Sequence, residues 1–222
     1  MTKISAVIIA FNEEDRIGKT LEHLQWCDEI LVVDSGSTDR TVEICRQADC
    51  KVLFREFDDY GTQKQFAVDQ AANDWVLSVD ADEVITPELK NEILKIFKNK
   101  PQVNGFFIKR STYFLGKVLK FCGLRREKVL RLFNRNKGKF VHTGIHERIE
   151  MEGETAVLKH RMLHYSYRDI SDHLSKIDKY TTLAAKNYVE KNKRYSKLMV
   201  ALKFPGRFLL VYFIKGGFLD GY

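Results

Sequence analysis

Short apolar runs alternate with helical patterns over residues 4–79, and this alternation constrains the fold more than any other feature of the sequence. The strand-like runs are 4–10, 30–33, 51–54 and 75–79. Between them, apolar residues recur at helical spacing near 17–24, 41–48 and 66–71. Strands that alternate with helices indicate a mostly parallel sheet in an α/β fold. Binding residues are then expected at the carboxyl ends of the strands.

Two helix starts are marked by residues that suit a helix N-terminus. Asn12 is a favourable capping residue, and the acidic run 13–15 suits the first turn of a helix. A later helix is expected from Thr86, because Pro87 stands at its first position and an apolar stripe follows over 89–97.

The pattern changes after Gly105. Strand-like segments at 106–108, 129–133 and 156–158 are separated by turns and predict an α+β half. An apolar stripe over 171–191 predicts a long amphipathic helix.

The last residues, 198–222, mix aromatic side chains with Lys and Arg. No run there is long enough and free enough of charge to predict a membrane span. The segment is expected either to lie in a membrane interface or to pack as a terminal helix on the domain.

Composition limits the class of partner but does not select one. The 222 residues carry 37 Lys and Arg against 30 Asp and Glu, a net charge of +7 that favours nucleic acid, anionic lipid or a phosphorylated substrate. The four cysteines show no metal-ligand spacing, and residues 1–10 do not resemble a signal peptide. We therefore expect a reduced, cytoplasmic protein.

The acidic run Asp80-Ala81-Asp82-Glu83 directly follows the buried strand 75–79. Three carboxylates at a strand end repel one another, and a divalent cation held by carboxylates and substrate phosphates would offset that repulsion. The alternative is a solvated acidic turn.

A second carboxylate, Asp34, ends the strand 30–33 and is followed by the small polar residues of Ser35-Gly36-Ser37-Thr38. Asp34 is placed to accept hydrogen bonds from a nucleobase or ribose. The alternative is that Asp34 forms the turn while Ser37 or Thr38 caps the next helix, and the two roles are compatible.

Together, Val7 to Glu14, Val32 to Asp39 and Val79 to Glu83 resemble, in that order, the family 2 glycosyltransferases with the GT-A fold. Within that family the chain is similar to the bacterial lipopolysaccharide core β-glycosyltransferases. The similarity is strong over about residues 3–90 and looser to about residue 190.

The resemblance implies an α/β GT-A fold: a Rossmann-like, mostly parallel but mixed sheet flanked by helices, with an α+β acceptor half and C-terminal helices. We expect one catalytic domain over 1–195, divided into a nucleotide-sugar half (1–100) and an acceptor half (101–195). Residues 196–222 are expected to form a helical segment that associates with a membrane.

The resemblance also implies where the donor binds. The residues implied to bind the nucleotide sugar are Ala10, Asn12, Glu13, Asp34, Gly36, Gln63, Lys64, Asp80, Ala81 and Asp82. Lys64 is a candidate for stabilising pyrophosphate charge, with a surface lysine as the alternative.

The implied cofactor is Mn²⁺ or Mg²⁺, since oxygen ligands suit both ions. Asp82 is the direct ligand that the resemblance implies, with Asp80 beside it. His164 is the candidate for a further ligand among the downstream histidines His142, His146 and His164, and a structural histidine is its alternative.

The acceptor base is less directly marked, because the usual Glu-Asp pair of the family is absent. Similar lipopolysaccharide enzymes carry a His-Glu in the region of His146-Glu147, so Glu147 is the candidate base, and with Asp82 the candidate catalytic pair. The alternative for Glu147 is a salt bridge to Arg148 or Arg131.

A basic cluster is a further candidate, either for the leaving diphosphate or for a phosphorylated lipid acceptor. Its cations are Arg125, Arg126, Lys128, Arg131 and Arg135.

The implied reaction is an inverting transfer of a sugar, glucose as the first candidate, from UDP to a saccharide hydroxyl of a lipopolysaccharide core or related glycolipid. It is expected at the inner face of the cytoplasmic membrane, without nucleic acid as a partner. The alternatives are a nucleotidyl or phosphoryl transferase, disfavoured because no Gly-rich phosphate loop is present, and a nucleic-acid-binding module. The sequence predicts no oligomeric state.

Overall fold

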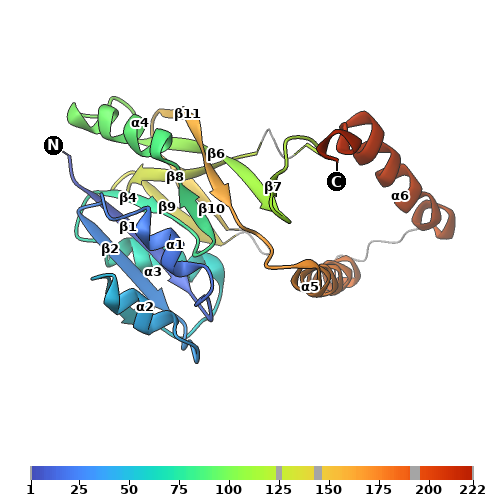
Figure 1. Ribbon diagram of the computed structural model, residues 1–222, viewed down its shortest axis with the longest axis horizontal. Helices are drawn as coiled ribbons and strands as arrows, with labels where there is room; N and C mark the ends of the chain where they lie inside the picture. The colour runs from blue at the N-terminus through green and yellow to red at the C-terminus, as the bar shows by residue number, and fades with distance from the viewer. Residues whose placement is uncertain (1, 124–126, 143–146, 191–195, 222) are drawn as a thin grey trace. The chain divides into compact units, whose positions relative to one another are not determined.

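The computed structural model describes residues 2–123, 127–142, 147–190 and 196–221. The chain separates into two compact units (Figure 1). Unit 1 comprises residues 1–110 and 128–164, and unit 2 comprises residues 111–127 and 165–222. The boundaries expected from the sequence, 100 and 195, remain predictions about function.

The main sheet joins a parallel half to an antiparallel half. Its spatial order is β3 (Lys51–Phe54), β2 (Glu29–Asp34), β1 (Ile4–Ala10), β4 (Trp75–Ser78), β8 (Lys128–Asn134), β6 (Gly105–Phe114), β11 (Thr155–His164) and β5 (Glu83–Ile85). Strands β3, β2, β1 and β4 run parallel, whereas β8 is antiparallel to both β4 and β6, and β11 to β5. The expected α/β class with a mixed sheet is confirmed.

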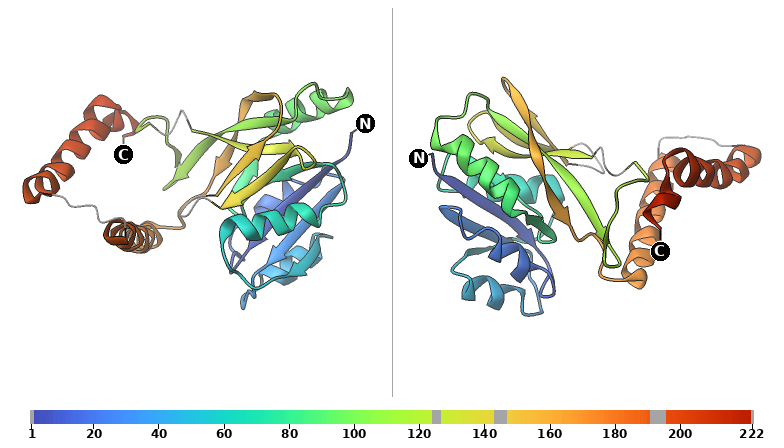
Figure 2. Two further views of the ribbon diagram at one scale, coloured as in Figure 1. Left: turned by 180° about the vertical axis from the view of Figure 1, so that it is seen from behind. Right: turned by 45° about the horizontal axis from the view of Figure 1, so that its top comes forward.

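Helices cover both faces of the parallel strands, as the continuous apolar runs require. Along β1, Ala6 and Ile8 belong to one core with α1 (Ile17–Glu22), α2 (Thr41–Gln47) and α4 (Pro87–Lys98). Val7 points into the other core, with Ala67 and Val68 of α3 (Tyr60–Asp69). Figure 2 shows α3 on the face opposite α1 and α2.

The first helix begins later than expected. Asn12 has a φ of 55°, in the left-handed region, and α1 starts only at Ile17. Asn12 therefore does not cap α1, and its side chain bonds to the neighbouring loop instead. The later helix α4 starts as expected, because the Thr86 hydroxyl accepts a hydrogen bond from the Leu89 N–H at 3.3 Å.

Three short strands of unit 1 had no marker in the sequence. One is β5, which directly follows the acidic turn, and the others are β9 (Gly138–His142) and β10 (Glu147–Met151), which form an antiparallel pair. Helix α3 packs against both β9 and β10. Because of this packing, Glu147 at the start of β10 lies close to α3, the helix that contains Lys64.

Unit 2 contains β7 (Lys117–Val118), α5 (Ile170–Glu190) and α6 (Lys197–Leu209), followed by a π-helical turn, Leu210–Ile214, and a 3₁₀ turn, Gly217–Asp220. The Asp220 carboxylate accepts hydrogen bonds from the N–H groups of Lys120 and Phe121 at 2.9 and 3.0 Å. Among the described residues, no helix is both long and apolar enough to cross a membrane.

Candidate active site

The loops that follow β1 and β2 are hydrogen-bonded to each other. Ala10, the last residue of β1, accepts through its carbonyl from the N–H of Ser35 at 3.0 Å. The Asn12 side-chain oxygen accepts from the Thr38 N–H at 2.8 Å. The N–H of Glu13 donates to the Thr41 hydroxyl at 2.7 Å. The loops at the carboxyl ends of β1 and β2, where the sequence predicts binding residues, therefore lie together.

Asp34 forms its own turn. Its Oδ2 accepts from the N–H groups of Gly36 and Ser37, both at 2.9 Å, and Gly36 has a φ of 92° that favours glycine. Gln63 supports this turn from α3: it is fully buried, and its amide donates to the Ser35 hydroxyl at 3.0 Å. Asp34 and Gln63 thus hold the loop in shape, and their contact with a nucleotide remains a prediction.

Asp80, at the carboxyl end of the β4 region, is held by two cations. Lys64 Nζ lies 2.7 Å from Asp80 Oδ1, and the Arg131 guanidinium donates to Asp80 Oδ2. Burial disfavours the ionised carboxylate, but Arg131 and Lys64 more than offset this and hold the pKa of Asp80 far below its usual value. Asp80 is therefore ionised at neutral pH.

Glu83 is the charged group that the sequence did not single out. Its side chain is fully buried, and its Oε1 accepts from Arg131 at 2.8 Å and from Arg110 at 3.3 Å. Its Oε2 accepts from the Asp80 N–H at 3.0 Å. Burial opposes the charge on Arg131, yet Asp80 and Glu83 together raise the pKa of Arg131 above its usual value. Glu83 thereby fixes Arg131, which in turn fixes Asp80.

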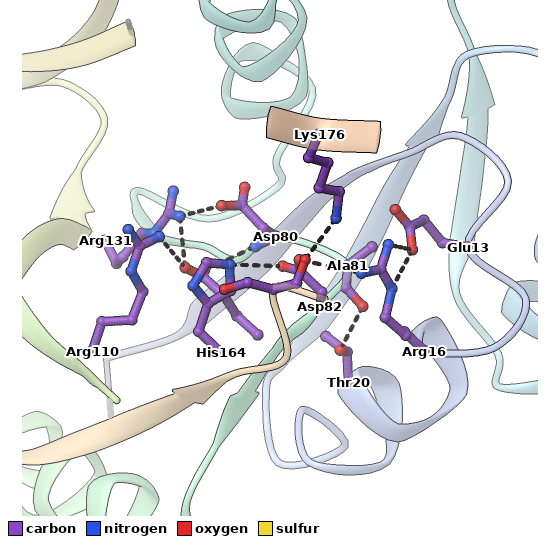
Figure 3. Close-up of polar contacts among 12 residues, drawn as sticks. Glu13, Arg16, Thr20, Asp80, Ala81, Asp82, Arg110, Arg131, His164 and Lys176 are labelled. Carbon is purple, nitrogen blue, oxygen red and sulfur yellow. Dashed lines mark hydrogen bonds and ion pairs between the residues drawn. The ribbon is translucent and has the colours of Figure 1, made fainter. Parts of the chain in front are cut away.

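Asp82 faces a different set of groups. His164 Nε2 lies 3.5 Å from Asp82 Oδ1, and Arg16 NH1 lies 3.6 Å from Asp82 Oδ2. Arg16 also pairs with Glu13 at 2.5 Å. Figure 3 shows Arg131 and Arg110 on one side of the acidic turn and Arg16 with Glu13 on the other.

The acidic turn is anchored to α1 from below. The Thr20 hydroxyl donates to the carbonyl of Ala81 at 2.8 Å, and Thr20 is buried. Figure 3 shows this contact, with Asp80 and Asp82 on either side of Ala81.

The repulsion among the three carboxylates is offset by protein cations, so repulsion alone does not require a metal. The described residues contain no group of three His, Cys, Asp or Glu side chains that could hold one. Asp82 and His164, however, are close enough to share an ion. A carboxylate together with substrate phosphates is the usual arrangement for Mg²⁺, and His164 would add one nitrogen ligand to it. These two residues fit the expected cation, while both oxygens of Asp80 already bind cations.

Glu147 lies in the same site. Lys64 Nζ, which pairs with Asp80, is also 2.7 Å from Glu147 Oε1. The expected partners of Glu147 are engaged elsewhere, because Arg148 pairs with Glu150 at 2.7 Å and Arg131 binds Asp80. The alternative of a salt bridge from Glu147 to Arg148 or Arg131 is thus wrong, because the cation that pairs with Glu147 is Lys64.

Lys64 is not the surface lysine that the sequence allowed as an alternative. Its side chain is 5% exposed. Burial disfavours an ionised Glu147, but Lys64 outweighs this and lowers the pKa of Glu147 below its usual value. The site thus contains an ionised carboxylate on each side of one buried ammonium.

The basic cluster does not gather at the site as a whole. Arg135 donates from its guanidinium to the carbonyls of Val68 and Asp69 at 3.4 and 3.3 Å, at the end of α3. The Arg135 backbone N–H donates to the carbonyl of Asp74, which precedes β4. Arg131 instead binds Asp80, which follows β4, so the two arginines lie at opposite ends of that strand. Arg125, Arg126 and His146, and the side chain of His142, lie outside the described residues.

Comparison with known proteins identifies relatives over almost the whole chain. The lipopolysaccharide core biosynthesis glycosyltransferase LpsC of Rhizobium meliloti is 31% identical over 220 residues, covering 96% of this chain and 82% of LpsC. An uncharacterized glycosyltransferase of Rickettsia typhi, RT0209, is 32% identical over 234 residues, covering 100% of this chain and 80% of that protein.

Solved structures with partial likeness include Staphylococcus aureus TarS 1-349 in complex with UDP. It is 28% identical with a TM-score of 0.44, covering 53% of this chain and 38% of that one. Glucosyl-3-phosphoglycerate synthase from Mycobacterium tuberculosis, in complex with Mn²⁺, UDP and phosphoglyceric acid, is 22% identical with a TM-score of 0.42, covering 50% and 43%.

The family described as Glycosyl transferase family 2 matches residues 5–151. The match spans the hydrogen-bonded loops after β1 and β2, the acidic turn, Lys64 and Glu147. It therefore covers all the site residues described above except His164. The chain belongs to glycosyl transferase family 2, and its mixed α/β sheet is the GT-A fold expected of that family.

Proposed function

We propose that the enzyme transfers a sugar, glucose as the first candidate, from a UDP-sugar to a saccharide hydroxyl of a lipopolysaccharide core or related glycolipid. The observation that carries this proposal is the pair of carboxylates, Asp80 and Glu147, joined by Lys64. One carboxylate is assigned to the donor and the other to the acceptor, and they belong to one site. The name of LpsC, a relative over most of the chain, supports the acceptor class.

The chemistry is a single displacement with inversion. The acceptor oxygen forms a bond to the anomeric carbon as the bond from that carbon to the diphosphate oxygen breaks, and the diphosphate leaves with the electron pair. Glu147 takes the acceptor's proton, which requires the hydroxyl within hydrogen-bond reach. A divalent cation at Asp82 and His164 would stabilise the charge on the leaving diphosphate.

Calorimetric titration with UDP, GDP and their sugar conjugates, with and without Mn²⁺, tests the donor assignment. We expect Mn²⁺-dependent binding of UDP that is lost in Asp82→Ala. Tighter binding of GDP than of UDP would overturn the choice of nucleotide, and equal binding by Asp82→Ala would overturn the role of Asp82.

Transfer assays test the base. Glu147→Gln should lose at least about a hundredfold in transfer rate, the usual worth of a positioned base. Glu150→Gln is the matched control, because Glu150 lies in the same strand and its partner Arg148 is 65% exposed. Wild-type turnover by Glu147→Gln would remove the base assignment.

We also propose that unit 2 contacts the inner face of the cytoplasmic membrane, where a glycolipid acceptor would be met. Helix α6 has no buried residue, and its exposed apolar side chains include Leu202 and Phe204, with Lys203 and Arg207 beside them. Apolar and basic groups on one helix suit an anionic lipid surface.

Vesicle binding tests this second proposal. We expect sedimentation with phosphatidylglycerol vesicles at low salt and little with phosphatidylcholine, and loss of binding in Leu202→Ser/Phe204→Ser. Failure of the wild-type protein to sediment with anionic vesicles at low salt would assign the segment a structural role, and equal sedimentation by the variant would move the contact away from Leu202 and Phe204. The family assignment favours sugar transfer over the nucleotidyl-transfer and nucleic-acid-binding alternatives.

A further inference from the structure

A single buried ammonium serves the two sides of the site. Lys64 Nζ is 2.7 Å from Asp80 Oδ1 and 2.7 Å from Glu147 Oε1, and the side chain is 5% exposed. An ammonium has three donors, and these two carboxylates use two of them. Lys64 also lies 6.0 Å from the centre of the Phe140 ring, which closes one side of its environment.

During sugar transfer, Asp80 can keep its ion pair with Lys64, whereas Glu147 must lose its own. Asp80 can share the ammonium with a diphosphate, since lysine binds phosphate as a point charge. Glu147 cannot act efficiently as a base while it is paired, because an ion pair stabilises the ionised carboxylate against taking a proton. Of these two ion pairs, the pair of Lys64 with Glu147 is therefore the one that opposes proton transfer from the acceptor hydroxyl.

We propose that Glu147 and the diphosphate of the donor compete for Lys64. Donor binding draws the ammonium toward the phosphates and releases the Glu147 carboxylate to receive the proton of the acceptor. The inference rests on the proposed function, in which the diphosphate lies at Asp80 and Glu147 is the base. Its consequence is that the base becomes effective only when a donor is bound.

Competition of this kind has a thermodynamic signature. If binding of the diphosphate must break the pair with Glu147, then removing the charge of Glu147 strengthens diphosphate binding, and it does so through Lys64. A coupling of ordinary size between two such sites corresponds to about a tenfold change in affinity. Simple repulsion between Glu147 and phosphate would also strengthen binding in Glu147→Gln, but it would not depend on Lys64.

The test is a double-mutant cycle on the affinity for UDP, measured by calorimetry in MnCl₂. The proteins are wild type, Glu147→Gln, Lys64→Met and the double variant, with Glu150→Gln as the control for loss of one nearby charge. We expect Glu147→Gln to bind UDP about tenfold more tightly than wild type. We expect the double variant to bind UDP as Lys64→Met does, and Glu150→Gln as wild type does.

Two results would overturn the inference: no tightening in Glu147→Gln, or the same tightening with and without Lys64. Lys64→Gln provides a second background if the buried methionine impairs folding, which thermal unfolding of each variant reveals. Transfer assays separate this inference from the proposed function. Tighter UDP binding together with undiminished transfer in Glu147→Gln would support competition and overturn the base assignment.

Discussion

His164 Nε2 lies 3.5 Å from Asp82 Oδ1, and the sheet itself creates this relationship. In the antiparallel pair of β11 and β5, His164 stands opposite Glu83, the residue after Asp82. The end of β11 is thereby fixed beside the acidic turn. The sequence selects His164 as the candidate ligand, and the strand register brings it beside Asp82.

The first prediction concerns His164. If His164 and Asp82 share a cation, His164→Ala should weaken Mn²⁺-dependent binding of UDP by about 10- to 100-fold and leave metal-free binding nearly unchanged. Calorimetry with and without Mn²⁺ measures both quantities. His160→Ala is the control on the same strand, since the His160 backbone N–H, not its side chain, bonds to Glu92. An equal loss of metal-free binding would indicate a structural role instead.

The second prediction concerns the buried charges around Arg131. Arg131→Met leaves the carboxylates of Asp80 and Glu83 without their shared cation and should lower the free energy of unfolding by about 3–5 kcal/mol. Arg148→Met removes an exposed pair and should lower it by about 0–1 kcal/mol. Urea unfolding followed by circular dichroism measures both, and equal losses would contradict this account of the network.

The third prediction concerns pH. Lys64 lowers the pKa of Glu147 below its usual value of 4.5, so the base stays ionised down to that pH. The kcat/KM for transfer, which reports the free enzyme in which Lys64 pairs with Glu147, should therefore be flat at neutral pH and should fall only as pH drops below 4.5. In Lys64→Met, burial remains while the cation is lost, so the acidic limb should move to higher pH. A limb that stays in place would show that Lys64 does not govern the base.

The fourth prediction concerns Asn12, whose φ of 55° and side-chain bond to Thr38 are both unusual for a helix cap. Asn12→Ala loses the bond and strains the left-handed backbone, and should destabilise the protein by about 2 kcal/mol. Asn12→Gly loses the bond but tolerates the backbone, and should cost about 1 kcal/mol. Thermal unfolding distinguishes the two, and an equal cost for both would assign the whole effect to the bond.

The sequence predicted the donor half well because its markers are local. Apolar runs predict β1, β2 and β4, and each is followed by polar residues that the fold brings to one edge. Thr86 and Pro87 likewise mark the start of α4 within a few residues of chain.

What the sequence did not predict depends on contacts between distant residues. The sequence offers Lys64 either as a pyrophosphate contact or as a surface lysine, and only the fold shows that it is buried between Asp80 and Glu147. Glu83 has no local sign of being fully buried, because its burial depends on Arg110 and Arg131. The late start of α1 follows from the bond between Asn12 and Thr38, which also joins separate parts of the chain.

The loops after β1 and β2 are joined by hydrogen bonds, and this affects how donor specificity can change. Asn12 and Glu13 are bonded to Thr38 and Thr41, so if these loops bind the nucleotide as proposed, little conformational entropy remains to be lost on binding. The same rigidity ties the two loops into one evolutionary unit. Under the proposed function, a substitution that reshapes one loop displaces the other, so a new donor preference should arise through paired changes across the two loops.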